Sequence, residues 1–279
     1  MLQFALNIKS QSPKLNIGIG ATPEHSLRVS TGILALTTFR HPVSGKIMAV
    51  FEEKVSVKID EKGEKVTAQL QPLGGASKLL RPLELYQQIG SFNYDEEKSQ
   101  KENDFRLQIR PQDWDKVKAF AMDHFNHPEK GVVEGSIDRE LNEELGDVLK
   151  VEVDPAAYQV SHLTVAVQNE PQQTERIEVS GNQTVRVFSV KGVDITDQTL
   201  IENITGSSEK TDTTQLIEKA RKKAQEKGSA KATGLVIISL EELQAHYRSL
   251  DIKKRDEATE IIVNGKKYKL ANNVGVTIP

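Results

Sequence analysis

The stretch Arg139-Glu140-Leu141-Asn142-Glu143-Glu144-Leu145-Gly146 carries three carboxylates within five positions. On an α-helix, offsets of three and four residues place Glu140, Glu143 and Glu144 on a common face, where like charges repel by roughly a few tenths of a kcal/mol per pair. A bound divalent cation would turn this repulsion into a net attraction, because hard cations such as Mg2+ take oxygen ligands and often join one or two carboxylates to substrate phosphates. The pattern therefore indicates a metal-binding helix.

The opposite face of this segment is aliphatic and is expected to hold the helix against a core; it consists of Ile137, Leu141, Leu145 and Val148. Ser136 is suited to cap the start of the helix, and Gly146 to end it in a left-handed conformation. Glu-rich helices are also common as solvated surfaces, so composition alone leaves a metal site and a plain acidic surface open.

The same eight residues resemble the C-terminal half of the Nudix box, written Gly-x5-Glu-x7-Arg-Glu-U-x-Glu-Glu-x-Gly-U, where U is aliphatic. The match holds at every fixed residue from Arg139 to Gly146, and the final aliphatic position is Asp147. The upstream half departs from the pattern, because its Gly and Glu would fall at Phe125 and Gly131.

A replacement for the missing upstream glutamate is therefore needed, and both Glu134 and the distal Glu209 are candidates. The glycine element is also displaced. Pro72-Leu73-Gly74-Gly75 resembles the entry to the box in Nudix proteins but lies far upstream, so the residues from about 76 to 130 would form an insertion.

This arrangement resembles the SMODS-associated Nudix domain, which is found beside bacterial nucleotidyltransferase antiphage systems. The resemblance covers about residues 25 to 250 and rests on three patches, at 73–76, 103–107 and 139–145. It implies an α/β fold, a Nudix-like α/β/α sandwich with a mixed sheet, elaborated by the insertion between the glycine loop and the acidic helix. We expect a Nudix-like domain over 1–250 and a C-terminal β-hairpin extension over 251–279, packed on the same domain.

The resemblance further implies a metal-dependent hydrolase of a nucleoside diphosphate-linked or nucleotide signal substrate, acting in antiphage defence with Mg2+ or Mn2+. Glu140, Glu143 and Glu144 would be the metal ligands, with Glu140 as ligand or water-activating base. Arg139 would orient them by pairing with Glu143 at an offset of four.

Substrate contacts are expected from the carbonyl of Gly74 or Gly75 and from cationic side chains that could bind phosphates, namely Lys78, Arg106 and Arg110. Each of these cations could equally serve only solubility. The competing hypothesis is a non-catalytic Nudix-fold nucleotide sensor or protein-interaction module, which the incomplete upstream motif favours and the three retained acids disfavour.

Composition restricts the remaining functions. The 279 residues include no cysteine, and the six histidines show no paired metal-ligand spacing, so a zinc site is not expected. The net charge of -3 and the scattered basic residues argue against duplex nucleic acid as a partner, and the basic run 219–227 includes a glutamate, Glu226, and suits a solvated helix face. We expect a small nucleotide-type ligand and, as protein partner, a second copy of the chain or a defence-system component.

No stretch of 18 apolar residues occurs, and the first residues lack a basic region, so we expect a cytoplasmic protein without a membrane partner.

Alternation and turn residues predict strands at 27–39, 46–51, 55–59, 65–70, 105–109, 148–153, 158–167, 184–190 and 234–239, and a hairpin at Asn264-Gly265. Helical spacing predicts helices at 79–89, after Pro111, at 213–227 and from Ser239. Segments 96–103 and 203–214, and a polar segment between the strands at 158–167 and 184–190, are expected to be loops.

Overall fold

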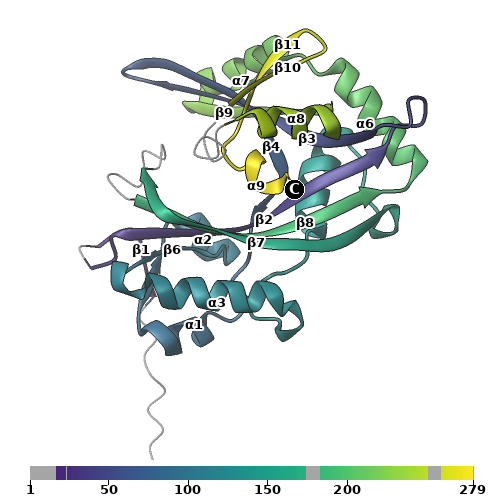
Figure 1. The fold of residues 1–279 in the computed structure, drawn as a ribbon. Coiled ribbons are helices and arrows are strands. Elements are labelled where there is room, and N and C mark those ends of the chain that lie inside the picture. The colour runs from purple at the N-terminus through teal and green to yellow at the C-terminus, as the bar shows by residue number, and fades with distance from the viewer. Residues whose placement is uncertain (1–16, 23, 174–182, 251–258, 279) are drawn as a thin grey trace, which may run out of the picture.

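The computed structural model describes residues 17–22, 24–173, 183–250 and 259–278. Its strands form one mixed sheet in the order β1-β5-β6-β2-β3-β4-β11-β10, with β8 joined to β2, β7 to β8 and β9 to β3 (Figure 1). The strands are β1 (Ile17–Ile19), β2 (Leu27–Arg40), β3 (Ile47–Asp60), β4 (Gly63–Ala76), β5 (Phe92–Tyr94), β6 (Arg106–Ile109), β7 (Tyr158–Gln173), β8 (Gln183–Ile195), β9 (Ser229–Ser239), β10 (Thr259–Val263) and β11 (Lys266–Leu270).

The strands β2, β3 and β4 form an antiparallel meander through the middle of the sheet. Both turns occur where the sequence predicts them, but the predicted break between 51 and 55 is wrong, because β3 is continuous. The strand accommodates Glu52 and Glu53 in its interior with help from other side chains: Gln71 donates to Glu52 at 2.6 Å, and Thr213 donates to one oxygen of Glu53 at 2.5 Å.

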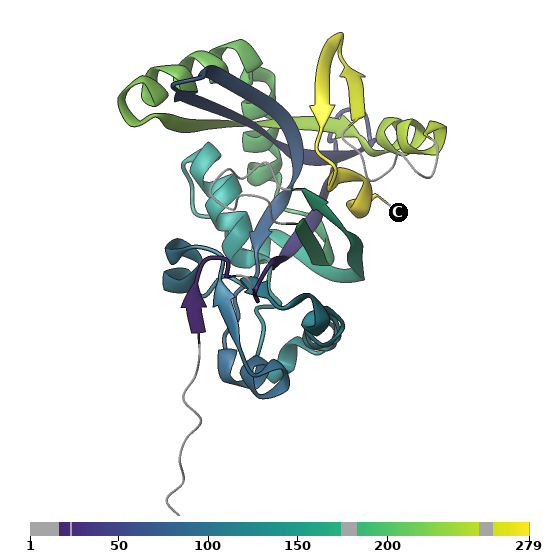
Figure 2. The same ribbon diagram turned by 90° about the vertical axis from the view of Figure 1, so that its left-hand side faces the viewer.

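Helices cover the sheet in separate groups (Figures 1 and 2). The longer ones are α1 (Pro82–Ile89), α3 (Trp114–Asn126), α6 (Gln198–Lys210), α7 (Thr213–Lys227) and α8 (Leu240–Ser249). Helix α3 packs on β7 and β8, whereas α7 and α8 pack on β3 and β9. The result confirms the predicted mixed α/β architecture and the predicted helix at 213–227.

The largest core lies between α3 and the sheet. Val117, Phe120, Ala121 and Phe125 are buried there, at the helical spacing seen in the sequence, and each phenylalanine contributes about 1.5–3 kcal/mol on burial. Trp114 is half-buried against the same core, with the Lys118 ammonium 5.7 Å from the ring centroid.

The acidic segment is helical but not uniform. It consists of α4 (Asp138–Leu141), a π-helical turn η3 (Asn142–Gly146) and α5 (Asp147–Leu149). The prediction that Gly146 ends the helix is wrong, and so is the predicted strand at 148–153: Gly146 is right-handed, and Lys150 supplies the left-handed stop at φ 60°. Gly146 is required for packing, because a Cβ there would lie 2.8 Å from the Val151 carbonyl oxygen.

Two segments expected as loops are helical in part. Residues 97–102 form the short helix α2, and the segment predicted as a loop at 203–214 contains the second half of α6. Asp197 caps α6 by accepting from the Leu200 N–H at 2.7 Å, and Ile204 is fully buried. The cap and the buried face outweigh the low helix propensity of the Gly, Ser and Thr residues that follow.

The C-terminal residues join the same sheet. Asn264 and Gly265 form the predicted hairpin turn with positive φ, and Ala271 beyond β11 donates its N–H to the Leu70 carbonyl of β4 at 2.8 Å. A short helix, α9 (Val274–Thr277), follows. The expectations for the first residues of the chain, and for part of the polar segment between β7 and β8, lie outside the described residues. In the described ranges, no helix has the length and apolar character needed to cross a bilayer.

We expect Gly74→Ala to destabilise the protein by about 3 kcal/mol or more. Gly74 has φ +138°, and a Cβ would lie 2.1 Å from the Ile33 carbonyl oxygen, which belongs to the backbone and cannot move aside. Chemical denaturation measures the loss. Gly206→Ala in α6 is the control, because its Cβ would meet nothing within 4 Å and should stabilise by about 0.4–1 kcal/mol. Equal changes in the two variants would contradict the strain assigned to Gly74.

Candidate functional site

The acidic segment borders a cleft of about 480 Å3, whose lining includes Glu52 and Lys54 from β3, the glycine segment of β4, Lys78, Asp104, Arg106, Arg139, Glu140, Glu143 and Glu144. We call it the acidic cleft. The structure thus brings together most of the residues that the sequence nominates: both glycines, three acids, Arg139, Lys78 and Arg106. Arg110 is not among them. It donates to Asp113 at 2.6 Å and to the Ile89 carbonyl at 2.6 Å, so it fixes the start of α3.

One edge of β4 positions the acids. Alternate residues of a strand direct their backbone groups to the same edge. Along this edge the Leu70 carbonyl accepts a hydrogen bond from the Ala271 N–H. Further along β4, at Gly74 and Ala76, the acidic segment lies where a neighbouring strand would otherwise be. The Gly74 N–H donates to the Glu144 carboxylate at 2.6 Å, and Arg139 donates to the Ala76 carbonyl at 2.9 Å. Two side chains therefore fasten the helix to the sheet.

Gly75 explains why the double glycine is needed. A Cβ at this position would lie 2.2 Å from a carboxylate oxygen of Glu140. Only the missing side chain lets the buried carboxylate of Glu140 rest directly on the backbone of β4.

Arg139 contacts three carboxylates in and next to the acidic segment. It donates twice to Glu134, at 2.9 and 2.7 Å, once to Glu143 at 3.0 Å, and lies 2.5 Å from Glu140. The pairing with Glu143 at an offset of four is the predicted one. These carboxylates raise the pKa of Arg139, with the Glu134 hydrogen bonds as the largest cause, so it remains a cation.

Glu134 and Glu209, the two candidates to replace the missing upstream glutamate, lie in different places in the structure. Glu134 holds Arg139 and also accepts from the Lys78 N–H at 3.2 Å, but it does not line the acidic cleft. Glu209 lines a different cavity, beside Lys266 and Tyr268. Glu134 therefore orients the arginine, and neither residue adds an oxygen to the cleft.

The three predicted acids are not equivalent. Glu140 is 5% exposed and Glu144 is half-buried, whereas the side chain of Glu143 is 59% exposed. Burial raises the pKa of Glu140, although the charge of Arg139 opposes the shift. Burial also raises the pKa of Glu144 well above its usual value; the neighbouring Glu52 adds to this shift, and the Gly74 N–H opposes it.

Glu52 is an acid of the cleft that the motif analysis missed. It is 4% exposed and accepts from Gln71 at 2.6 Å and from Lys54 at 3.2 Å. Its signal in the sequence is the pair Glu52-Glu53 between two apolar runs that form a single strand. A charged residue in the interior of a buried strand requires a partner or a function.

The patch Asp104-Phe105-Arg106 serves both the core and the cleft. Phe105 is fully buried, and the Asp104 carboxylate lies 2.7 Å from the Lys78 ammonium and 3.3 Å from Arg106. Asp104 therefore holds two cations at the rim of the acidic cleft, where an anionic ligand could compete for them.

The donor set fits a divalent cation that brings further ligands with it. Within the described residues, no three His, Asp or Glu side chains converge as a complete metal cage. Glu140 and Glu144, however, place two carboxylates against adjacent residues of β4, Gly75 and Gly74, in the same cleft. Mg2+ commonly needs only one or two carboxylates, and takes its remaining oxygens from water and substrate phosphates.

The acidic helix is thus fastened to a glycine-containing strand of a mixed sheet. A model of the SMODS-associated NUDIX domain family matches residues 60–234, more than half of the chain. The chain belongs to this family, which confirms the resemblance and the Nudix-like fold. Among curated proteins, no sequence matches the chain.

The raised pKa of Glu144 predicts a pH-dependent effect of Glu144→Gln. An acid whose pKa is raised on folding destabilises the native state as the pH rises from the unfolded-state pKa through the folded-state pKa. The amide has the same shape and can still accept from Gly74, but it carries no charge. At neutral pH without metal ions, the variant should therefore melt higher, by roughly 3 °C, the shift expected for about 1 kcal/mol in a protein of this size.

Thermal melts at several pH values measure this effect, and the difference should vanish at acidic pH, where wild-type Glu144 is protonated. Glu143→Gln is the control, since that side chain is exposed. A variant less stable than wild type at neutral pH would contradict the assigned cost of the buried charge.

Proposed function

We propose that the protein is a metal-dependent hydrolase that cleaves a diphosphate linkage in a nucleotide or a nucleotide-derived signal, in the setting of antiphage defence. The observation that carries this proposal is the pair of carboxylates, buried Glu140 and half-buried Glu144, held against Gly75 and Gly74 in an open cleft with cations at its rim. Family membership supports the class of substrate.

The proposed reaction is attack of water on one phosphorus of the diphosphate. The new P–O bond forms as the bridging P–O bond breaks, the electron pair leaves with the second phosphate, and the water proton passes to a carboxylate. Glu140 suits the role of base, because burial raises its pKa above the usual value and Arg139 fixes its position. A bound Mg2+ or Mn2+ would offset charge on the phosphates and lower the pKa of the attacking water.

The other residues of the cleft have supporting roles in this proposal. Glu144 and Glu140 would hold the cation, with Glu143 at the open rim as a further ligand once it leaves Arg139. Lys78 and Arg106 would bind phosphate oxygens by exchanging their contacts with Asp104. The protein thereby presents anionic oxygens on one wall and cationic groups on another, which a metal–diphosphate complex requires.

A non-catalytic nucleotide sensor is the second candidate. It is favoured by the absence, within the described ranges, of three converging metal ligands, and by the engagement of Glu143 with Arg139. A sensor would bind the same nucleotide without releasing product.

We expect the purified protein with Mg2+ or Mn2+ to release monophosphate products from at least one member of a panel of ADP-ribose, NAD and dinucleoside polyphosphates, all of which contain a diphosphate linkage. Glu140→Gln and Glu144→Gln should each lower kcat by about 100-fold or more, because each removes a charge needed in the transition state. Chromatography of the products measures turnover. Glu241→Gln, on the exposed start of α8, should leave it unchanged. Tight binding without product would establish the sensor instead.

A further inference from the structure

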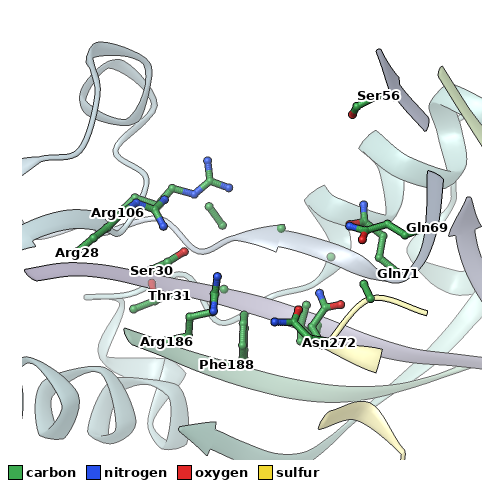
Figure 3. A pocket seen from close by; sticks show the side chains of 17 residues that line it. Arg28, Ser30, Thr31, Ser56, Gln69, Gln71, Arg106, Arg186, Phe188 and Asn272 are labelled. Carbon is green, nitrogen blue, oxygen red and sulfur yellow. The ribbon is translucent and has the colours of Figure 1, made fainter. Parts of the chain in front are cut away.

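A second cavity lies directly beyond the glycine segment. It has about the same volume, 480 Å3, and shares Gln71, Gly74, Gly75, Ala76 and Arg106 with the acidic cleft. A smaller space of about 250 Å3 continues from it and shares Arg186, Phe188, Asn272 and Asn273. Figure 3 shows Arg186, Phe188 and Asn272 on one side of this cavity and Arg28 and Arg106 at one end. We call the two spaces together the basic pocket.

The sheet register places these residues on one face. Ser30 of β2 is paired with Arg186 of β8 and Arg106 of β6, and Gly32 is paired with Phe188 and Ala76. Paired residues share a face, so this row lies opposite the α3 core, to which the alternate residues such as Val29 and Ile33 belong. The basic pocket is therefore built by the open face of the sheet.

The wall between the two cavities has almost no side chains. Gly74 and Gly75 have none and Ala76 has only a methyl group, so the backbone of this segment is the common boundary of the two cavities. Arg106 lines both spaces and could contact the molecule from either side. The two cavities therefore adjoin at Arg106 and the glycine segment.

The charges of the basic pocket suit an anion. Arg28 is bonded to Asp95 at 2.7 Å and Arg106 to Asp104 at 3.3 Å, whereas no carboxylate within the described ranges forms an ion pair with Arg186. Arg186 instead donates to the neutral Gln168 amide at 2.8 Å. Burial and the charge of Arg28 both disfavour its protonated form, so a phosphate would be stabilising here.

The other polar and aromatic groups suit a nucleobase. Phe188 presents a half-buried ring beside the Asn272 and Asn273 amides, and the Asn273 side-chain oxygen is buried without a hydrogen-bond partner among the described residues. A base can stack on an aromatic face and bond amides with its edge. Both asparagines lie beyond residues 60–234, the segment that the family model matches.

We propose that the basic pocket is a nucleotide subsite, in which the base stacks on Phe188, the Asn272 and Asn273 amides contact its edge, and the adjacent phosphate binds Arg186 and Arg106. The ligand is then a nucleotide with at least two phosphate groups, extending past Arg106, which lines both spaces, with a further phosphate in the acidic cleft. The part in the acidic cleft rests on the proposed function, whereas the subsite itself requires only binding.

The test is equilibrium binding in the presence of Mg2+, with ADP-ribose, NAD and diadenosine tetraphosphate as nucleotide probes and inorganic tripolyphosphate as the base-free comparison. Wild-type protein should bind at least one nucleotide about tenfold or more tightly than tripolyphosphate. Phe188→Leu keeps an apolar side chain but removes the aromatic face. It should lower the affinity for that nucleotide about tenfold and leave the affinity for tripolyphosphate unchanged. Asn272→Ala should act in the same direction.

Arg186→Gln should also weaken nucleotide binding. Arg221→Gln should not, because Arg221 lies on α7, away from the basic pocket, and pairs with Glu64 of β4. Melting temperatures confirm that each variant is folded. Three results would overturn the subsite. Nucleotide binding could be insensitive to both Phe188→Leu and Asn272→Ala, or these variants could lose as much affinity for tripolyphosphate as for the nucleotide. The third is a wild-type protein that binds nucleotides no more tightly than tripolyphosphate. Phe188-dependent binding without turnover would support the subsite and reject the hydrolase.

Discussion

The functional part of the molecule depends on how the acidic helix closes the free edge of β4. Glu144 accepts from the Gly74 N–H and Arg139 donates to the Ala76 carbonyl, so the helix supplies the bonds that a neighbouring strand would otherwise make. A buried backbone group left without a partner costs about 1–3 kcal/mol. The same side chains that are available for chemistry are therefore also needed for folding, and the carboxylates are held where the sheet requires them.

This arrangement has an electrostatic consequence. Glu52, Glu140 and Glu144 are gathered in one cleft, and their neutralisation falls mainly to Arg139 and Lys54. The raised pKa values of Glu140 and Glu144 show that the protein environment disfavours their charged forms. A ligand that brings positive charge, such as a metal ion bound to a phosphate, would relieve this repulsion, whereas a bare anion would meet only the cations at the rim.

The sequence predicted the parts of the site that are local and missed those that depend on distant pairing. Arg139 to Gly146 could be assigned because contacts at helical offsets follow from spacing, and Asn264-Gly265 because a two-residue turn has strict backbone requirements. The π-helical turn was missed because it arises where the helix fits against β4. Glu52 and Arg186 were missed because only the register of β3, β4 and β8 brings them to the cavities.

The two cavities are built largely from different helices and strands. The acidic cleft is built on the helix of residues 138–149, and the basic pocket on the open face of β2 and β8 together with Asn272 and Asn273. Because the strand between them lacks bulky side chains, residues that select a base can change without moving the carboxylates, provided that Gly74 and Gly75 are kept. The glycine segment is therefore needed for packing on both sides: Gly75 makes room for the Glu140 carboxylate, and Gly74 lets β4 lie directly against the backbone of β2.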